Sequence, residues 1–288
     1  MKQLTVISGK GGTGKTSLVA SFAHLSRGRA VMADCDVDAP DLHLILDPTI
    51  VEAREFHALK LAKIDKSRCT ACGECKARCR FQAIRDLQVQ RLHCEGCKVC
   101  QLVCPEEAIT MVDRLAGHAY LSHTRLGPLV HARLLPGEGT SGKLVTMVRD
   151  MASALARKQG MDMVIIDGSP GIGCPVIASL TASDHALVVT EPTLSGMHDL
   201  SRVLEVASHF GIDASVCINK YDLNKENAAM IEDRCRSAGV PMVARIPFDP
   251  QVARAIVARR PVVELGGPAS EAINDRWAAV HGRLFGKI

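Results

Sequence analysis

The chain has few aromatic residues, little net charge and no long apolar segment. Aromatic side chains make up 3% of its 288 residues, which leaves no stacking platform for single-stranded nucleic acid. The formal net charge of +4 is too small to argue for binding to DNA or RNA. No apolar run approaches the ~20 residues that span a bilayer, and the first residues lack the apolar core of a secretory signal. We therefore expect a cytoplasmic protein without nucleic-acid or membrane partners.

Apolar runs and helical stretches alternate along most of the chain. Hydrophobic residues make up 47% of the sequence, enough for a large buried core. Runs typical of buried parallel strands are 4–7, 30–33, 163–166, 186–190 and 215–218. Helical stretches are predicted at 15–25, 142–158 and 198–210. The alternation predicts an α/β fold whose mostly parallel sheet is covered by helices.

A glycine-rich loop follows the first predicted strand and precedes a helix. Residues 9–16 read GKGGTGKT and match the phosphate-binding pattern G-x4-G-K-[ST] in the context that makes it credible. Lys15 would reach the β- and γ-phosphates, and the Thr16 hydroxyl would bind Mg²⁺. Backbone N–H groups of the loop would wrap the phosphates. The predicted nucleotide-binding residues are Gly11, Gly12, Thr13, Gly14, Lys15, Thr16 and Ser17.

A second lysine in this loop, Lys10, resembles the deviant loop of the MinD/ParA superfamily of P-loop ATPases. The resemblance implies a homodimer with ATP, in which Lys10 contacts the partner's nucleotide. It also implies that Asp36, in the segment Asp34-Cys35-Asp36, positions the attacking water. Asp167, after the third predicted strand, would hold Mg²⁺ through water.

Further segments resemble the same superfamily. Gly168-Ser169-Pro170-Gly171 would be a second nucleotide-sensitive switch. Asn219 would bond the adenine edge, and Pro247 lies in a loop like the family's second adenine-side segment. Cys174 stands at a place similar to the cluster-ligating cysteine of the nitrogenase iron protein. A small buried thiol is the alternative for Cys174.

Eight of the twelve cysteines lie between Cys69 and Cys104, in two copies of the pattern C-x2-C-x2-C-x3-C. Each copy is followed by Ala-Ile at the same offset. Thiolates at this spacing hold [4Fe–4S] clusters. Zinc is the alternative, because two C-x2-C pairs can bind one Zn²⁺. The eight cysteines in tandem order favour two iron–sulfur clusters.

The block resembles a bacterial two-cluster ferredoxin, in which the fourth cysteine of each run ligates the other cluster. The resemblance implies a first cluster on Cys69, Cys72, Cys75 and Cys104. It implies a second cluster on Cys94, Cys97, Cys100 and Cys79. We expect an inserted ferredoxin domain at 64–111 within a MinD-like domain formed by 1–63 and 112–288.

Two further segments of the predicted main domain have recognisable patterns. The residues from His118 to Leu135 are predicted to form a hairpin that returns to the main domain. At the C-terminus, Ile273, Trp277, Val280, Leu284 and Ile288 share one helical face. We expect this helix to dock on the sheet, although a basic amphipathic helix can also bind membrane.

The combined motifs predict an ATP-binding and ATP-hydrolysing iron–sulfur protein. Our first hypothesis is a nucleotide-gated electron-transfer homodimer that acts on an unidentified redox partner. An Mrp-like carrier that delivers clusters to an acceptor protein is the second hypothesis. A MinD/ParA-like positioning ATPase whose clusters are structural or sensory is the third.

Overall fold

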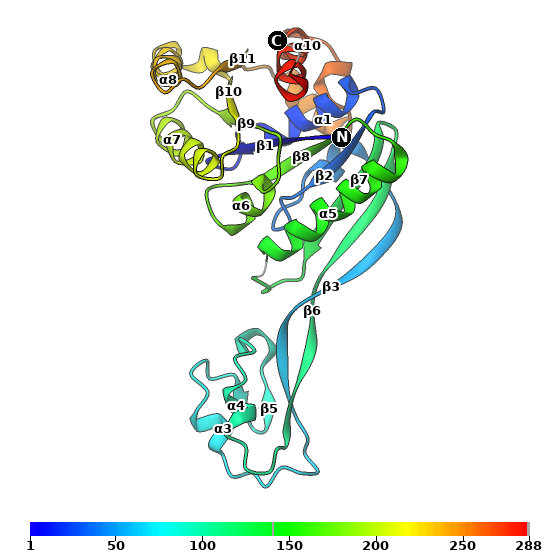
Figure 1. Ribbon diagram of the computed structural model, residues 1–288, viewed down its shortest axis with the longest axis vertical. Helices are drawn as coiled ribbons and strands as arrows, with labels where there is room; N and C mark the ends of the chain where they lie inside the picture. Colours follow the sequence, from blue (N-terminus) through cyan, green and yellow to red (C-terminus); the bar gives the residue numbers. More distant parts are fainter. Residues whose placement is uncertain (140, 287–288) are drawn as a thin grey trace. The chain divides into compact units, whose positions relative to one another are not determined.

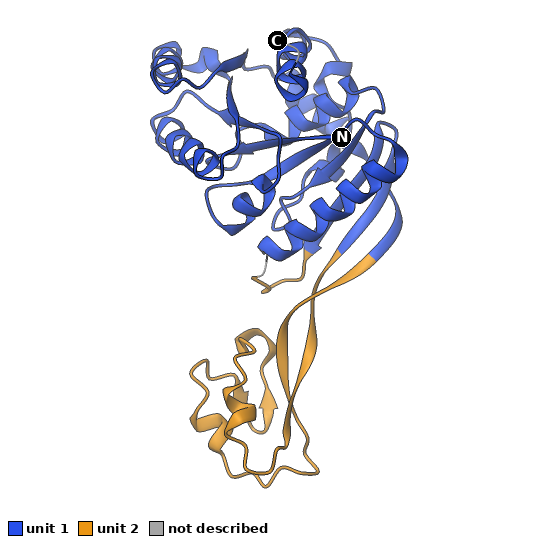
Figure 2. Cartoon of the chain, viewed as in Figure 1, with its two compact units in different colours: residues 1–53, 119–133, 141–288 blue, residues 54–118, 134–140 orange. Residues whose placement is uncertain are grey.

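The computed structural model describes residues 1–139 and 141–286. It divides into two compact units (Figure 2). Unit 1 comprises residues 1–53, 119–133 and 141–288, and unit 2 comprises 54–118 and 134–140. Unit 2 therefore includes more residues than the predicted insertion at 64–111. The physical reason is that Leu61, Ala62 and Met111, on the strands that flank the cysteine block, pack into the apolar core of unit 2.

The described strands of the main sheet number nine, in the order β11-β10-β9-β1-β8-β2-β7-β6-β3. Pairing is parallel from β11 through to β7. The strands are β1 (Lys2–Ser8), β2 (Ala30–Asp34), β3 (Thr49–Ile64), β6 (Ile109–Thr124), β7 (Gly127–Leu134), β8 (Met163–Pro170), β9 (His185–Thr190), β10 (Ala214–Asn219) and β11 (Met242–Ile246). Each of the five predicted apolar runs is a strand of this sheet, and the predicted hairpin is formed by β6 and β7.

Helices of unit 1 lie on both faces of the parallel strands (Figure 1). They are α1 (Lys15–Leu25), α2 (Leu42–Leu46), α5 (Ser141–Gln159), α6 (Cys174–Leu180), α7 (Leu194–His209), α8 (Lys225–Ser237), α9 (Gln251–Val257) and α10 (Pro268–Phe285), with short 3-10 turns η2 (Tyr221–Leu223) and η3 (Val262–Glu264). The three predicted helices correspond to α1, α5 and α7. The α/β prediction for this part of the chain is confirmed.

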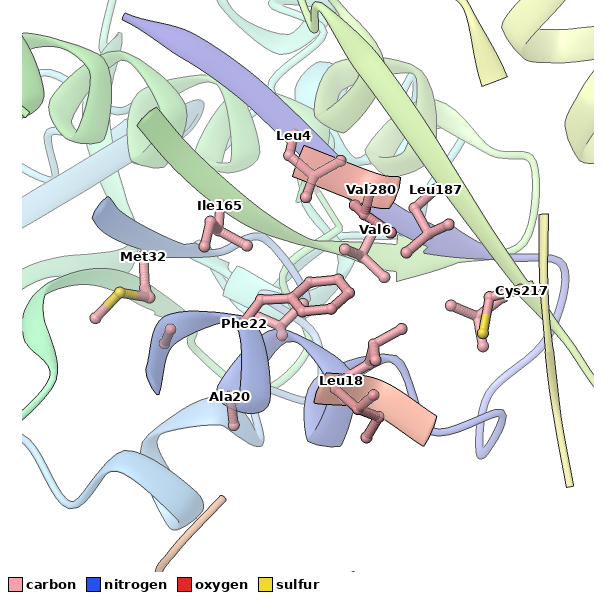
Figure 3. Packing of buried hydrophobic residues seen from close by; sticks show 14 of the residues in the cluster. Leu4, Val6, Leu18, Ala20, Phe22, Met32, Ile165, Leu187, Cys217 and Val280 are labelled. Carbon is pink, nitrogen blue, oxygen red and sulfur yellow. The ribbon is translucent and has the colours of Figure 1, made fainter. Parts of the chain in front are cut away.

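Alternate residues of β1 supply two separate cores. Leu4 and Val6 pack with α1 and α10, as Figure 3 shows, whereas Ile7 packs with residues of α6 and α7. Successive strand side chains point to opposite faces of a sheet. A continuous apolar run is therefore what a strand needs when helices cover both faces.

The C-terminal helix α10 docks on the core, as predicted. Ile273, Val280 and Leu284 are buried in the cluster that includes Leu4 and Val6. The Trp277 ring lies 4.8 Å from that of Phe22, between centroids. The last residue of the predicted face, Ile288, is outside the described residues. In the described part of the chain, no helix has both the length and the hydropathy to cross a membrane.

Unit 2 contains only short elements between the long strands β3 and β6. They are α3 (Glu74–Ala77), the antiparallel pair β4 (Ile84–Arg85) and β5 (Gln88–Val89), the 3-10 turn η1 (Arg91–His93), and α4 (Val99–Leu102). Its apolar core is small and includes cysteines themselves, among them the buried Cys75 and Cys94. A unit of this size gains little stability from apolar burial alone.

Candidate functional site

The glycine loop lies between β1 and α1 and needs glycine at two positions. The backbone φ angles of Gly12 and Gly14 are 77° and 90°, values that residues other than glycine rarely adopt. A methyl group at Gly14 would also lie 2.4 Å from the Asn219 side-chain nitrogen. That nitrogen donates to the Thr13 carbonyl at 2.8 Å. Asn219 therefore holds the loop in shape, and its contact with adenine stays a prediction.

A cavity of about 780 Å³ opens beside this loop. Its size is that of a typical small-ligand site. The predicted residues that line it are Gly11, Gly12, Gly14, Lys15, Thr16, Ser17, Asp36, Asn219 and Pro247. The apolar side chains of Leu44, Phe248 and Ile256 also line it, and their roles were not predicted. The glycine loop and an apolar wall thus share one cavity, an arrangement that suits the phosphates and the base of a nucleotide.

Buried carboxylates lie at the end of β2 and within β8, on neighbouring strands of the sheet. Asp34 and Asp167 are opposite each other in the strand register, and both are at most 1% exposed. Burial raises the pKa of Asp167 to about 7, while the nearby Lys15 ammonium lowers it. Burial and the Asp167 charge raise the pKa of Asp34 well above its ordinary value. Burial likewise raises the pKa of Asp36.

The surroundings of Asp167 fit a magnesium site. Neither of its carboxylate oxygens accepts a hydrogen bond of normal geometry from the described residues. The Thr16 hydroxyl is close enough to lower the pKa of Asp167. Buried unpaired carboxylate oxygens beside a phosphate loop are suitable partners for Mg²⁺ or its bound water. Asp167 and Thr16 would therefore hold the ion.

Asp34 has a structural role that the sequence analysis missed. Its carboxylate accepts the backbone N–H groups of Asp36 and Leu42, each at 3.1 Å. It thereby shapes the loop that carries Asp36 to the cavity wall. The D-x-D pattern in the sequence could have indicated this role, because Asp34 is its first aspartate.

Replacing Asp167 with asparagine should flatten the pH dependence of stability in the nucleotide-free protein. The pKa of Asp167 rises from 3.8 to about 7 on folding, so the folded chain binds the proton more tightly. The free energy of unfolding should therefore fall as pH rises from about 4 to 7, by up to about 4 kcal/mol. Denaturant titrations of both proteins across this range test the difference. Parallel pH profiles would contradict the assignment.

Lys10 is held within its own chain. Its ammonium lies 3.2 Å from Glu191 Oε2 and 3.4 Å from Thr193 Oγ1. Lys220 pairs with the other Glu191 oxygen at 2.6 Å and donates to the Gly12 carbonyl at 3.4 Å. These two ammonium groups lower the pKa of the Glu191 carboxyl, against the effect of burial. Glu191 therefore restrains Lys10, a role that no sequence pattern indicated.

In unit 2, cysteines from both runs meet around one small cavity. Cys69, Cys72, Cys75 and Cys104 all line it. Burial raises the pKa of Cys75, and the thiolates of Cys69, Cys104 and Cys72 raise it further. The structure thus brings together the four residues predicted for the first cluster. Their pattern crosses from one run to the other, as in the ferredoxin resemblance.

Cysteines of the second predicted set also lie near one another. Burial raises the pKa of Cys100, followed by the charges of Cys94 and Cys97. Cys79 and Cys100 pack against the same apolar core. Within residues 1–139 and 141–286, no three His, Cys, Asp or Glu side chains converge as ligands of a single metal ion. A cluster larger than one ion would hold its sulfurs farther apart.

The repeated Ala-Ile pair has a structural explanation. The N–H of Ala83 donates to Cys79 Sγ at 3.4 Å, and that of Ala108 donates to Cys104 Sγ at 3.3 Å. Ile84 and Ile109, which follow, are each 3% exposed and fill the core. Each repeat therefore supplies one N–H···S bond and one apolar anchor, and both features fit thiolate ligands of a cluster.

Cysteines outside the two runs differ in exposure. Cys35, Cys217 and Cys235 are buried, and burial raises the pKa of each thiol. Cys174 is exposed at the first residue of α6, so it is not the buried thiol of the alternative prediction.

Comparisons with known proteins agree with this site. The family model described as the CobQ/CobB/MinD/ParA nucleotide binding domain matches residues 4–262. An uncharacterized protein of Methanocaldococcus jannaschii is 32% identical over 277 residues, which cover 96% of this chain and 95% of that protein. The septum site-determining protein MinD of Neisseria meningitidis is 27% identical over 149 residues, covering 48% of this chain and 54% of that protein.

Solved structures show the same fold. MinD from Pyrococcus horikoshii, complexed with Mg-ADP, has a TM-score of 0.58 at 17% identity and covers 97% of this chain and 95% of its own. The ATP complex of Cyanothece McdA(D38A) has a TM-score of 0.58 at 20% identity and covers 98% of this chain and 96% of its own. With a family match over most of its length, this chain belongs to the CobQ/CobB/MinD/ParA nucleotide-binding family.

Proposed function

We propose that this chain is a nucleotide-gated electron-transfer protein. Unit 1 would bind ATP with Mg²⁺, and unit 2 would carry two [4Fe–4S] clusters as a ferredoxin domain. The observation that carries the proposal is the cavity lined by Cys69, Cys72, Cys75 and Cys104. Its ligand set combines two sequence runs in the ferredoxin order, which a chance arrangement of thiols would not produce.

The protein's own groups would stabilise the bound clusters. When bound, each [4Fe–4S] cluster accepts and releases one electron. The N–H···S bonds from Ala83 and Ala108 offset thiolate charge and thereby tune the potential. The fourth cysteine of each run would also link the two halves of unit 2. Cluster binding would then supply folding free energy that the small apolar core lacks.

The nucleotide would act through residues of unit 1. Lys15 and Thr16 would bind the phosphates and Mg²⁺, and Asp36 and Asp167 would position water and metal. Lys10 would leave Glu191 and contact the nucleotide of a second subunit in an ATP-bound homodimer. Lys220 pairs with the same carboxylate and would keep Glu191 neutralised when Lys10 leaves. Closure would change the access of an unidentified redox partner to the clusters.

The decisive measurement is EPR of the reduced protein with and without Mg-ATP, together with iron and zinc analysis. We expect about eight iron atoms per chain and a spectrum or potential that changes with nucleotide. A Lys15→Ala variant should keep the iron and lose the nucleotide response. Zinc in place of iron would contradict the cluster assignment. Full iron content with a nucleotide-independent spectrum would contradict gating.

A second candidate function is the delivery of clusters to an acceptor protein. The exposure of Cys174 at the start of α6 favours it, because a transfer site needs an accessible thiol. Mixing the loaded protein with a cluster-free ferredoxin tests this function. Rapid transfer that Cys174→Ser blocks would favour the carrier over the electron-transfer protein.

The third candidate is a positioning ATPase, which the similarity to MinD supports. It requires ATP-dependent recruitment to a surface and no redox partner. Sedimentation with lipid vesicles or DNA, with and without ATP, distinguishes it from the first two functions.

A further inference from the structure

A buried charge pair in unit 2 has no part in the functions described so far. Arg114 Nε donates to Glu138 Oε1 at 2.8 Å. The side chains of Arg114 and Glu138 are only 3% and 1% exposed. Arg91, which is 42% exposed, contacts the same oxygen at 3.0 Å. Burying a carboxylate and a guanidinium is costly in free energy even when they pair. The pair is therefore a candidate for a functional role.

The Arg114 guanidinium also contacts the backbone of a proposed cluster ligand. Its Nη1 donates to the carbonyl oxygen of Cys94 at 2.8 Å, in a buried setting. The ion pairs nearest the first run differ in this respect. Arg68 with Glu107, and Arg78 with Glu74, are all more than half exposed. A buried charge pair thus lies beside a predicted ligand of the second cluster, whereas these two ion pairs near the first run are exposed.

Glu138 comes from a segment that leads directly into unit 1. The segment 134–140 follows β7 and precedes α5, whose first residue is Ser141. Within unit 2, it is fixed by the bond from Leu135 N–H to the Ala116 carbonyl at 2.9 Å. Glu138 is therefore bound in unit 2, three residues before a helix of unit 1.

Within unit 1, the start of α5 lies against the start of α6, which follows the proposed second switch. A methyl group added at Gly142 would lie 3.4 Å from Cβ of Cys174. Cys174 begins α6, three residues after Gly171, where the proposed switch ends. A nucleotide-dependent shift of that switch would therefore displace the first turn of α5. Such a displacement would reach Glu138, because Glu138 precedes Ser141 by only three residues in the sequence.

We propose that Glu138 and Arg114 couple the nucleotide state of unit 1 to the reduction potential of the second cluster. The proposal rests on the proposed function. A displaced Glu138 leaves the Arg114 charge less neutralised beside Cys94. Charge and hydrogen bonding around the ligands are what set the potential of an iron–sulfur cluster. Arg114 and Glu138 are positioning residues, because they act through Cys94.

Opposite shifts in two variants test the electrostatic part. Glu138→Gln leaves Arg114 unneutralised and should raise the potential of the second cluster in an EPR-monitored titration. Arg114→Gln leaves the Glu138 carboxylate without this partner and should lower the potential. Arg114→Lys keeps the positive charge and should keep most of the wild-type potential. Arg68→Gln is the matched control and should leave that potential unchanged. Shifts of the same sign in the first two variants would indicate a structural role only and overturn the proposal.

The nucleotide part is tested in the same proteins. Mg-ATP should shift the potential of the second cluster in the wild type, and Glu138→Gln should lose the shift while it keeps full iron and nucleotide affinity. Amide exchange at residues 134–139 should respond to Mg-ATP in the wild type, a readout that needs no redox measurement. An equal shift in Glu138→Gln, or none in a loaded, nucleotide-binding wild type, would overturn the coupling. Missing iron in the wild type would instead overturn the proposed function.

Discussion

Cys104→Ser should remove the first cluster, although Cys104 belongs to the second cysteine run. Its thiol lines the same cavity as Cys69, Cys72 and Cys75, so its loss leaves that site with three ligands. Iron content should fall from about eight to about four atoms per chain. Unit 2 should also become less stable, because its core is small and includes the cysteines. Iron analysis and EPR of the reduced variant measure both effects.

Matched cysteine variants separate this expectation from a general loss of iron. Cys69→Ser should leave the same remaining EPR signal as Cys104→Ser, since both residues line one cavity. Cys100→Ser, from the same run as Cys104, should leave the other signal. A Cys104→Ser spectrum that matches Cys100→Ser would contradict the crossed arrangement. Cys174→Ser is a control that should keep all of the iron in unit 2.

Lys15→Ala should abolish ATP hydrolysis and leave the iron content intact. Lys15 is 5% exposed in the glycine loop, and it lines the cavity that would hold the phosphates. Removing one preorganised charge from a transferring phosphoryl group costs on the order of 10²-fold or more in rate. Phosphate release and Mg-ATP affinity measure the loss. The clusters are in unit 2, so their EPR signals in the nucleotide-free protein should not change.

Lys10→Ala provides the comparison within the same loop. Lys10 contacts Glu191 and lines no part of the described cavity, so its removal should preserve nucleotide binding by the monomer. Hydrolysis that requires a dimer should nevertheless fall, and sedimentation with a non-hydrolysable ATP analogue should show monomers. Hydrolysis at the wild-type rate in Lys15→Ala would contradict the site. Full dimerisation of Lys10→Ala would contradict the role given to Lys10.

The parallel sheet could be predicted because its strands are continuous apolar runs. Leu4–Ile7 and Met163–Ile166 are buried on both faces, so tertiary packing agrees with the local pattern. The limits of unit 2 could not be predicted in this way. Most residues of β3 are exposed, whereas β6 mixes buried and exposed residues without a regular alternation. Only packing against the cysteine core shows where unit 2 begins.

Residue types at short, fixed spacings were enough to predict the family, the phosphate loop and the two cysteine runs. Tertiary structure decided which groups meet across long separations. Asn219 supports Thr13, Glu191 holds Lys10, and Glu138 pairs with Arg114. Such contacts are set by strand register and by the return path of the chain, so no local pattern encodes them. Their free energy comes from hydrogen bonds and charge pairs in partly or fully buried surroundings, which only the folded chain provides.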